Sequence, residues 1–293
     1  MVIPVLLAIF MTFITASSNI LLKKGFSKIS PLISSYFSIF ISVVLLWIAT
    51  WLFVPKGYFY NFKGILVFII VGSFAPTIVR TLTYYGIDRI GAGRAAPLRA
   101  MTPFFAVIMA IMFLKESPKP IIFIAIALII LGVFLITKKN VKDAQLKLKP
   151  RHFLYPLVAA FLAGLAANMR KYGLNIMAQP IFASAIAATS SLVILSFYIL
   201  LKRRKEITAA LSQRKELRLV IIAALLTSCG EVVDLSALLY GSVSLVVPIF
   251  ATTPLIIVFL SWIFLKDHEV VTKKIALATI IIVLGLCLTV VSK

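Results

Sequence analysis

The sequence has few acidic residues, few cysteines and few histidines, and each shortage excludes a class of protein. Only nine Asp and Glu accompany 30 Lys and Arg in 293 residues. Cys229 and Cys287 lie in separate apolar segments and form no CxxC motif, so they predict neither a disulfide framework nor a thiolate metal site. With two histidines, no HExxH and no GxxxxGK[ST], the chain shows no carrier for metal-dependent or nucleotide-dependent catalysis. We therefore predict no enzyme activity, no cofactor and no bound metal.

Apolar residues dominate what is present. They make up 62% of the chain, charged residues make up 13%, and the mean hydropathy is +1.10. A soluble domain would not tolerate this composition on its surface. The apolar runs are about 20 residues long, the length with which a helix crosses a hydrocarbon core of about 30 Å. The predicted fold class is therefore all-α, a polytopic protein of the cell membrane, surrounded by lipid.

The net charge of +21 does not indicate a nucleic-acid partner, because the Lys and Arg cluster in short connections between apolar runs. We divide the chain into ten spans within one transmembrane domain, 1–293. Its halves, 1–137 and 152–293, are joined by a basic linker, 138–151. The predicted spans are 2–22, 32–54, 65–86, 93–114, 120–137, 153–172, 180–201, 219–240, 243–265 and 273–292.

The two halves resemble each other. Residues 96–116 align without a gap on 247–267, and eight of the 21 positions are identical, including the Thr-Pro pairs at 102–103 and 253–254. Because each half holds an odd number of spans, the halves must lie in opposite orientations. Such inverted repeats can open a shared central site to either side of the membrane, as alternating access requires.

These residues resemble a known family. Ten spans in two repeats, each with a Pro-x4-Thr-Pro helix ending in Leu-Lys-Glu or Leu-Lys-Asp and then an apolar helix with Leu-Gly, resemble the drug/metabolite transporter superfamily of EamA type. The resemblance implies a secondary transporter for small metabolites such as amino acids, nucleobases, nucleotide sugars or drugs, often an exporter. It also implies that helices 5 and 10 lie outside the cavity and help subunits to pair. A homodimer is therefore one alternative for the assembly.

Charged residues inside the spans are the main candidates for a site. Glu231 and Asp234 are three residues apart and share a helix face with Thr227. An acid at the centre of a spanning helix is disfavoured by about 2.5 to 3.5 kcal/mol on insertion scales, so two acids need a reason. Arg80 and Arg99 also lie inside predicted spans. In one interpretation an arginine holds a substrate carboxylate or phosphate, and an acid binds an amino group or a coupling proton. In the other, acids and arginines only neutralise one another.

Further polar and proline residues complete the candidate site. Asn19, its repeat mate Asn168, and Tyr84 either line a cavity or bond between helices. Four prolines at matched places in the halves are candidate hinges or cavity-shaping residues: Pro97, Pro103, Pro248 and Pro254. Lys115–Glu116 is interpreted as an interfacial anchor at a span end.

The sequence thus favours a secondary active transporter that moves a small polar or zwitterionic metabolite, such as an amino acid, out across the cytoplasmic membrane. Protons are a candidate coupling ion, because burial favours the neutral form of a carboxyl group. One alternative is a drug or lipid-precursor exporter. The alternative from another class is a membrane receptor or intramembrane enzyme, against which the inverted repeat and the missing catalytic set argue.

The loop charges predict the orientation. Loops that follow odd-numbered spans, counted together with the adjoining span ends, hold 21 Lys and Arg, whereas loops after even-numbered spans and the C-terminus, counted in the same way, hold seven. The positive-inside rule therefore places both chain ends outside, although members of the resembling family are often described with both ends in the cytoplasm. A C-terminal reporter that is active only in the cytoplasm is expected to stay dark, and a reporter in loop 138–151 to be active. The opposite result would reverse the orientation.

Overall fold

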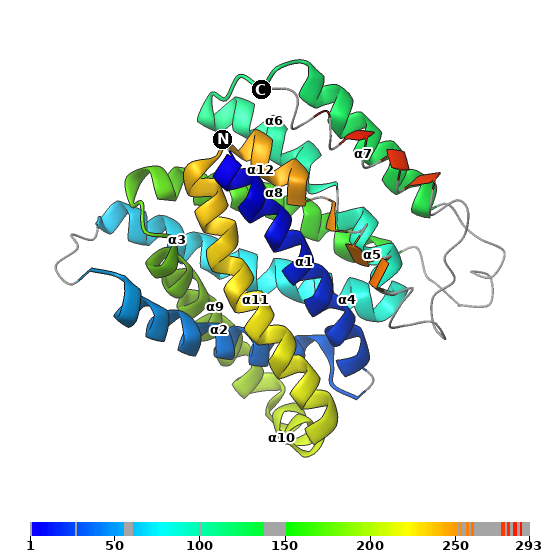
Figure 1. The fold of residues 1–293 in the computed structure, drawn as a ribbon. Helices are drawn as coiled ribbons and strands as arrows, with labels where there is room; N and C mark the ends of the chain where they lie inside the picture. Colours follow the sequence, from blue (N-terminus) through cyan, green and yellow to red (C-terminus); the bar gives the residue numbers. More distant parts are fainter. Residues whose placement is uncertain are drawn as a thin grey trace.

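The computed structural model describes residues 2–26, 28–55, 61–99, 101–137 and 151–250, together with individual positions from 252 to 288. Most of these residues are helical, and no strand occurs among them. The helices gather into one bundle (Figure 1). In chain order they are α1 (Val2–Gly25), α2 (Pro31–Phe53), α3 (Phe62–Phe74), the π-helical turn η1 (Ala75–Val79), α4 (Arg80–Ile90), α5 (Ala92–Arg99), α6 (Thr102–Leu114), α7 (Ile121–Thr137), α8 (Arg151–Ile176), α9 (Pro180–Lys202), α10 (Arg204–Ser212), α11 (Arg214–Tyr240) and α12 (Val243–Phe250).

Six of the predicted spans are helices long and apolar enough to cross a membrane: α1, α2, the continuous segment from α3 to α4, α8, α9 and α11. The fourth span is divided into α5 and α6, with Pro103 in the first turn of α6. A proline disfavours helical backbone just before it and is well tolerated in a first turn, so the chain restarts its helix there. The fifth span is the shorter helix α7, and helical positions from 253 to 288 fall within the ninth and tenth spans.

Helix α10 is an element that the apolar pattern did not predict. It has nine residues and lies within the polar connection 202–218. Nine residues are too few to cross a bilayer, so α10 leaves the number of membrane crossings unchanged. The helix α8 extends beyond the predicted end of its span, to Ile176, so Arg170 lies further inside the helix than predicted and is no longer a residue of the span end. Leaving Arg170 out of the count lowers the poorer side from seven cations to six.

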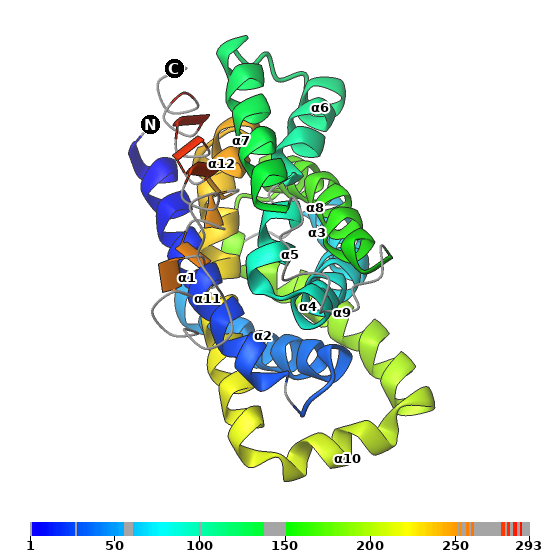
Figure 2. The ribbon, with the colours of Figure 1, turned by 90° about the vertical axis from the view of Figure 1, so that its right-hand side faces the viewer.

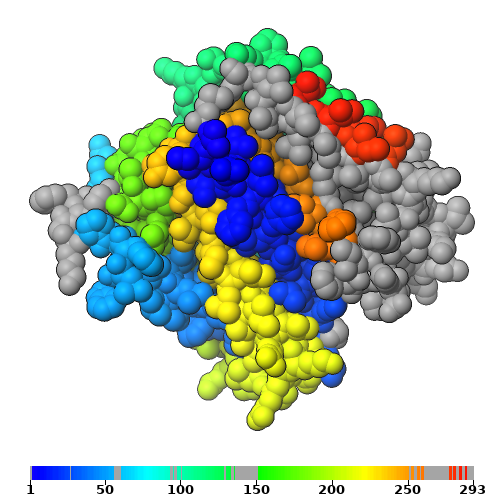
Figure 3. All heavy atoms as spheres, in the orientation of Figure 1, coloured from blue at the N-terminus to red at the C-terminus, as the bar shows by residue number. Residues whose placement is uncertain are grey.

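The packing of the helices follows a two-fold pattern. Helix α1 packs along α11, and α8, the first helix of the second half, packs along α3 and α4. Likewise α2 packs against α11 while its counterpart α9 packs against α3. Figure 3 shows α1 and α11 side by side on one face. If α1 is exchanged with α8, α2 with α9, and the α3–α4 segment with α11, each of these contacts becomes another observed contact. This is expected for two inverted five-helix repeats. The boundaries at 137 and 152 stay a prediction, because 138–150 lie outside the described residues.

The π-helical turn η1 interrupts the third span at Pro76. Proline has no N–H, so the carbonyl of Gly72 loses its usual donor four residues later. The Thr77 hydroxyl replaces it and donates to the Gly72 oxygen at 3.2 Å. The helix resumes as α4, whose first residue, Arg80, donates its N–H to the carbonyls of Ala75 and Thr77. In a membrane such a break needs this internal compensation, because no water is available to the backbone.

Two apolar clusters close the bundle at its ends. One gathers residues near the loops that follow α2, α8 and α11, including Phe68, Met177, Leu238 and Val246. The other gathers residues near the loops that follow α1, α4 and α9, including Leu22, Ile87 and Ile199. Most of these side chains are at most 1% exposed. The polar residues of the spans are left between these two packed ends.

Candidate functional site

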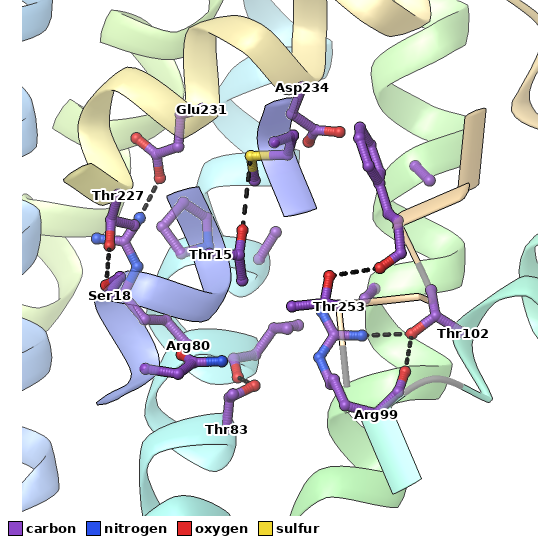
Figure 4. A pocket seen from close by; sticks show the side chains of 18 of the residues that line it. Thr15, Ser18, Arg80, Thr83, Arg99, Thr102, Thr227, Glu231, Asp234 and Thr253 are labelled. Carbon is purple, nitrogen blue, oxygen red and sulfur yellow. Dashed lines mark hydrogen bonds and ion pairs between the residues drawn. The ribbon is translucent and has the colours of Figure 1, made fainter. Parts of the chain in front are cut away.

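A cavity of about 280 Å³ lies between α1, α4, α8 and α11, and residues of η1, α5, α6 and α12 together with Thr253 and Ile257 add to its wall (Figure 4). We call it the central cavity. Its volume is just below the roughly 300 to 1,000 Å³ typical of small-molecule sites, so it suits one small metabolite. Its polar and charged lining comprises Thr15, Ser18, Asn19, Arg80, Thr83, Tyr84, Arg99, Thr102, Arg170, Thr227, Glu231, Asp234 and Thr253.

Arg80 and Glu231 form an ion pair across the two halves of the chain. Arg80 is 9% exposed and Glu231 is 15% exposed. A second guanidinium nitrogen of Arg80 donates to the Ser38 hydroxyl at 3.1 Å, and the Tyr84 hydroxyl donates to the same oxygen at 3.4 Å. Glu231 and Ser38 thus hold Arg80 directly at the start of α4, and Tyr84 bonds Ser38. The other oxygen of Glu231, Oε2, is buried and accepts no hydrogen bond from the described residues.

Asp234 pairs with Arg170, a partner that the sequence interpretation missed. Arg170 Nη1 donates to Asp234 Oδ2 at 2.5 Å, and the side chains are 20% and 13% exposed. The sequence feature that could have identified Arg170 is that it is a charged residue inside the predicted span 153–172. Ala163, Ala167 and Arg170 follow the helical repeat and all line the central cavity. Both acids of α11 thus have an arginine partner, and for Asp234 it is Arg170 and not Arg99.

Arg99 enters the cavity from the last turn of α5, where the fourth span is divided. Its guanidinium donates to the hydroxyl of Thr102, which in turn donates to the Arg99 carbonyl. Within the described part of the chain Arg99 forms no ion pair with a carboxylate. The central cavity therefore holds three arginines and two acids, an excess of one positive charge.

The two asparagines, predicted as repeat mates, have different surroundings. Asn19 lines the central cavity. Asn168 does not line it, since its amide nitrogen donates to the carbonyls of Ala106 and Gly164, both at 2.9 Å, and ties α8 to α6. Thr227 lines the cavity and is 3.0 Å from the Ser18 hydroxyl, a contact between α11 and α1. Sequence periodicity predicted the same role for both asparagines. In the packed bundle Asn168 instead joins two helices.

Of the four predicted prolines, Pro103 and Pro248 lie beside the cavity rather than on its wall. Pro103 opens α6 directly after Thr102, and Pro248 sits inside α12 directly after the lining residue Val247. The backbone of Pro97 lies within α5, and Pro254 is outside the described residues. Pro76 of η1, which the sequence analysis did not single out, lines the cavity itself. A hinge role for any of these prolines stays a prediction.

In each half, a lysine near the end of the first span bonds the last carbonyls of the third span. We call these two contacts, which lie at opposite ends of the bundle, the matched lysine contacts. Lys23, near the end of α1, donates to the carbonyls of Ile87 and Asp88 in the last turn of α4, both at 3.2 Å. Lys171, near the end of α8, donates to the carbonyls of Leu238 at 2.8 Å and Leu239 at 3.5 Å in the last turn of α11. A cation is favoured there because the unpaired carbonyls carry partial negative charge.

Glu116 reinforces the Lys171 end. Its carboxylate accepts hydrogen bonds from the N–H groups of Val243 at 3.0 Å and Ser244 at 3.1 Å, and also from the Ser244 hydroxyl. These are the first residues of α12, so Glu116 caps that helix. The residue was interpreted from sequence as an interfacial anchor. It connects the end of α6 to the hairpin between α11 and α12 instead.

Comparison with known proteins agrees with this architecture. The model of the EamA-like transporter family matches residues 2–138 and 152–291, once in each half of the chain. The chain belongs to the EamA-like transporter family. One solved protein crystal structure is similar to this EamA-like chain over 98% of its length and 96% of that chain, with a TM-score of 0.72 and 11% identity, which shows the fold alone. No curated protein sequence matches.

Family membership makes the protein a multi-pass membrane transporter of the drug/metabolite superfamily. The position of α7 also agrees with what the resemblance implied for the fifth helix, since no described residue of α7 lines the central cavity. The described lining comes instead from three spans of each half: the first, third and fourth, and their counterparts the sixth, eighth and ninth. The chemistry of a transported molecule therefore has to be sought among the residues of the central cavity.

The Arg80–Glu231 pair predicts a pattern of stabilities. Glu231→Gln leaves Arg80 buried without its carboxylate, and breaking such a pair typically costs about 3 to 5 kcal/mol. The melting temperature of the purified protein is expected to fall clearly. The double variant Arg80→Gln/Glu231→Gln removes both charges and is expected to recover most of the loss.

A surface pair gives the control. Glu216 pairs with Lys28, which is 59% exposed, and Glu216→Gln is expected to cost less than about 1 kcal/mol. A double variant whose loss equals the sum of its two single losses would mean that Arg80 and Glu231 do not stabilise each other.

Proposed function

We propose that this EamA-like transporter is a secondary active transporter that moves a small zwitterionic metabolite, such as an amino acid, out across the cytoplasmic membrane by alternating access. The observation that carries the proposal is the charge pattern of the central cavity. Two ion pairs stand beside Arg99, for which the described residues supply no carboxylate. An uncompensated cation in a membrane interior is costly, so a ligand that brings a negative charge is favoured.

In this proposal Arg99 holds the carboxylate of the substrate. The guanidinium can present two parallel N–H donors to a carboxylate, which fixes the orientation of the substrate as well as its charge. Thr102, already bonded to Arg99, would hold the guanidinium in place. A carboxylate bound here would also remove the excess positive charge of the cavity.

The acids of α11 supply the complementary half of the site. Glu231 and Asp234 both line the central cavity, and Glu231 keeps one oxygen without a donor. An ammonium group has three donors and no acceptor, so it matches a carboxylate oxygen with spare capacity. A substrate with an ammonium group and a carboxylate would therefore have a partner for each of its charges: the carboxylate offsets the excess charge of the cavity, the ammonium group restores it, and the net charge stays at +1.

The charged wall argues against the alternative of an apolar drug or lipid-precursor exporter. An apolar molecule in this cavity would displace water from five charged side chains and return no hydrogen bonds to them. Such desolvation is costly when nothing compensates for it. The apolar part of the lining, which includes Met11, Val79 and Phe250, suits the short side chain of a small metabolite.

Proton coupling in this proposal would use the same acids of α11. A substrate ammonium group and a proton compete for one carboxylate, because protonation removes the negative charge that the ammonium group needs. A proton that enters from outside would then displace the substrate, as export driven by a proton gradient requires. The proton leaves again when the carboxylate pairs with its arginine.

The matched lysine contacts support alternating access. Lys23 fastens α1 to α4 at one end of the cavity, whereas Lys171 and Glu116 fasten the tip between α11 and α12 at the other. Since the halves are related by a two-fold axis, releasing one end and fastening the other gives two states of similar energy. In this proposal each lysine contact closes one side of the cavity and breaks when that side opens.

Substitution of Arg99 tests the substrate site. In proteoliposomes, exchange of labelled amino acids against unlabelled ones needs no ion gradient and reports binding alone. Arg99→Gln is expected to reduce this exchange at least about tenfold, because a charged hydrogen bond contributes about 1.5 to 3 kcal/mol. Arg99→Lys should keep part of it, because the charge remains.

Arg89→Gln removes an exposed arginine at the end of α4 and is the control that should exchange like wild type. If nucleobases or sugar phosphates exchange and amino acids do not, the zwitterion is the wrong substrate. If no polar compound exchanges, the drug or lipid-precursor alternative replaces this proposal.

The lysine contacts predict opposite shifts in access. Thr15→Cys places a thiol in the cavity wall, in a background with Cys229→Ser and Cys287→Ser. A membrane-impermeant maleimide is added on the side of the loop between α6 and α7. Lys171→Met is expected to raise labelling several-fold and Lys23→Met to lower it, because each loses a hydrogen bond that closes one end.

Lys115→Met, an exposed lysine next to Glu116, should leave labelling unchanged. Equal changes in the same direction for Lys23→Met and Lys171→Met would mean that the two contacts only stabilise the fold.

A further inference from the structure

Helix α10 lies across one end of the bundle, between the ends of α9 and α11 (Figure 2). One hydrogen bond attaches α10 to α2, and an ion pair attaches the adjoining start of α11. Glu206 accepts a hydrogen bond from Ser30, the N-cap residue of α2, at 3.1 Å and pairs with Arg203 at 2.6 Å. Glu216, in the first turn of α11, pairs with Lys28 at 3.6 Å. The connection between α9 and α11 is thus a fixed part of the fold.

The outer surface of this connection is strongly cationic. Four consecutive cations at 202–205 and three more at 214, 215 and 218 are all exposed. The segment contains two acids, Glu206 and Glu216, and both are used in the contacts that attach it. We call these seven exposed cations the basic platform. Among the described residues of the opposite end, the exposed lysines are Lys63, Lys115 and Lys119.

The apolar side of α10 is already covered. Ala210 is 4% exposed and Ile207 is partly buried, and both pack against the apolar cluster at this end of the bundle. The exposed side carries Lys205, Thr208 and Ser212, with Ala209 and Leu211 beside them. Leu211 is the one large apolar side chain of α10 that is exposed, at 51%, so α10 offers less apolar than cationic surface to a partner.

We propose that the basic platform binds the anionic headgroups of phospholipids in the leaflet that it faces. A helix that crosses the end of a membrane bundle lies at the level of the headgroups. Cations within a Debye length of an anionic lipid surface are attracted to it, and arginine matches phosphate oxygens with paired donors. The positive charge of the basic platform and the position of α10 at the end of the bundle together favour lipid headgroups over lipid hydrocarbon as the binding partner.

The same cations also favour one orientation of the protein when it inserts into the membrane, but this role does not explain how they are arranged on the surface. The positive-inside rule requires only that cations lie near the ends of spans in short loops. It does not require Glu206 and Glu216 to form contacts within the protein. Nor does it require the cations to lie on the exposed side of a helix that packs against the bundle. A headgroup site benefits from both features, since nearby free carboxylates would repel a phosphate.

The experiment follows the melting temperature of the full-length protein, purified in detergent, as short-chain phosphatidylglycerol or phosphatidylcholine is added. Wild type is expected to be stabilised by phosphatidylglycerol far more than by phosphatidylcholine, and less so at high salt. Each cation near an anionic lipid surface accounts for roughly a fivefold change in affinity. Arg204→Gln/Lys205→Gln is therefore expected to need about 25-fold more phosphatidylglycerol for the same shift.

Matched variants separate charge from folding. Arg204→Lys/Lys205→Arg keeps both charges and should respond like wild type. Lys63→Gln/Lys115→Gln removes two charges from the opposite end and should also respond like wild type. The proposal is overturned if phosphatidylcholine stabilises as well as phosphatidylglycerol, or if the Arg204→Gln/Lys205→Gln variant keeps the wild-type response.

Glycerol phosphate distinguishes a membrane headgroup from a soluble anion. It carries the same phosphate without acyl chains, and an equal stabilisation by it would assign the basic platform to a soluble ligand and overturn the lipid assignment. None of these measurements involves transport, so their outcome is independent of the proposed substrate.

Discussion

The need to neutralise charge inside a membrane organises the centre of this protein. Two acids on α11 each meet an arginine, Arg80 from the first half and Arg170 from the second. Removing water from these groups is tolerable only because opposite charges and hydroxyl groups replace it. The Arg80–Glu231 pair also holds the two halves together across the space in which a substrate would sit. In the proposed mechanism, stability and substrate binding therefore depend on the same side chains, and a ligand would compete with or complement these pairs.

The backbone obeys a second constraint of the membrane, which is that every broken helical bond must be replaced. At Pro76 the Thr77 hydroxyl serves the Gly72 carbonyl. At the ends of α4 and α11 lysines serve the last carbonyls, and Glu116 serves the first N–H groups of α12. Breaks and helix ends are thus supported by side chains from neighbouring helices. Where a side chain provides a backbone bond, movement of one helix is linked to the integrity of another, which is the kind of link that an alternating mechanism uses.

The repeats are alike in packing and unlike in chemistry. Helices α1 and α8 have equivalent neighbours, yet Asn19 faces the cavity while Asn168 bonds the backbone of α6. Both acids belong to α11, whereas the corresponding segment of the first half contributes Arg80. An inverted repeat supplies two conformations, and only the differences between its halves can supply one site with separate positive and negative regions. The basic platform adds a further asymmetry, since it belongs to the connection between α9 and α11 and lies at one end of the bundle.

The sequence by itself determined the membrane class, the helical spans and the repeat, because runs of about 20 apolar residues and the matched Pro-x4-Thr-Pro segments are local features of the chain. It also indicated Glu231, Asp234, Arg80 and Arg99, since an ionisable residue inside a span stands out against apolar neighbours. Tertiary structure alone decided the partners: Arg170 for Asp234, Ser38 for Arg80, and Glu116 for the start of α12. These contacts join residues 42 to 128 positions apart. Helical periodicity assigns a side chain to a face, but only the packed bundle determines which face of another helix it meets.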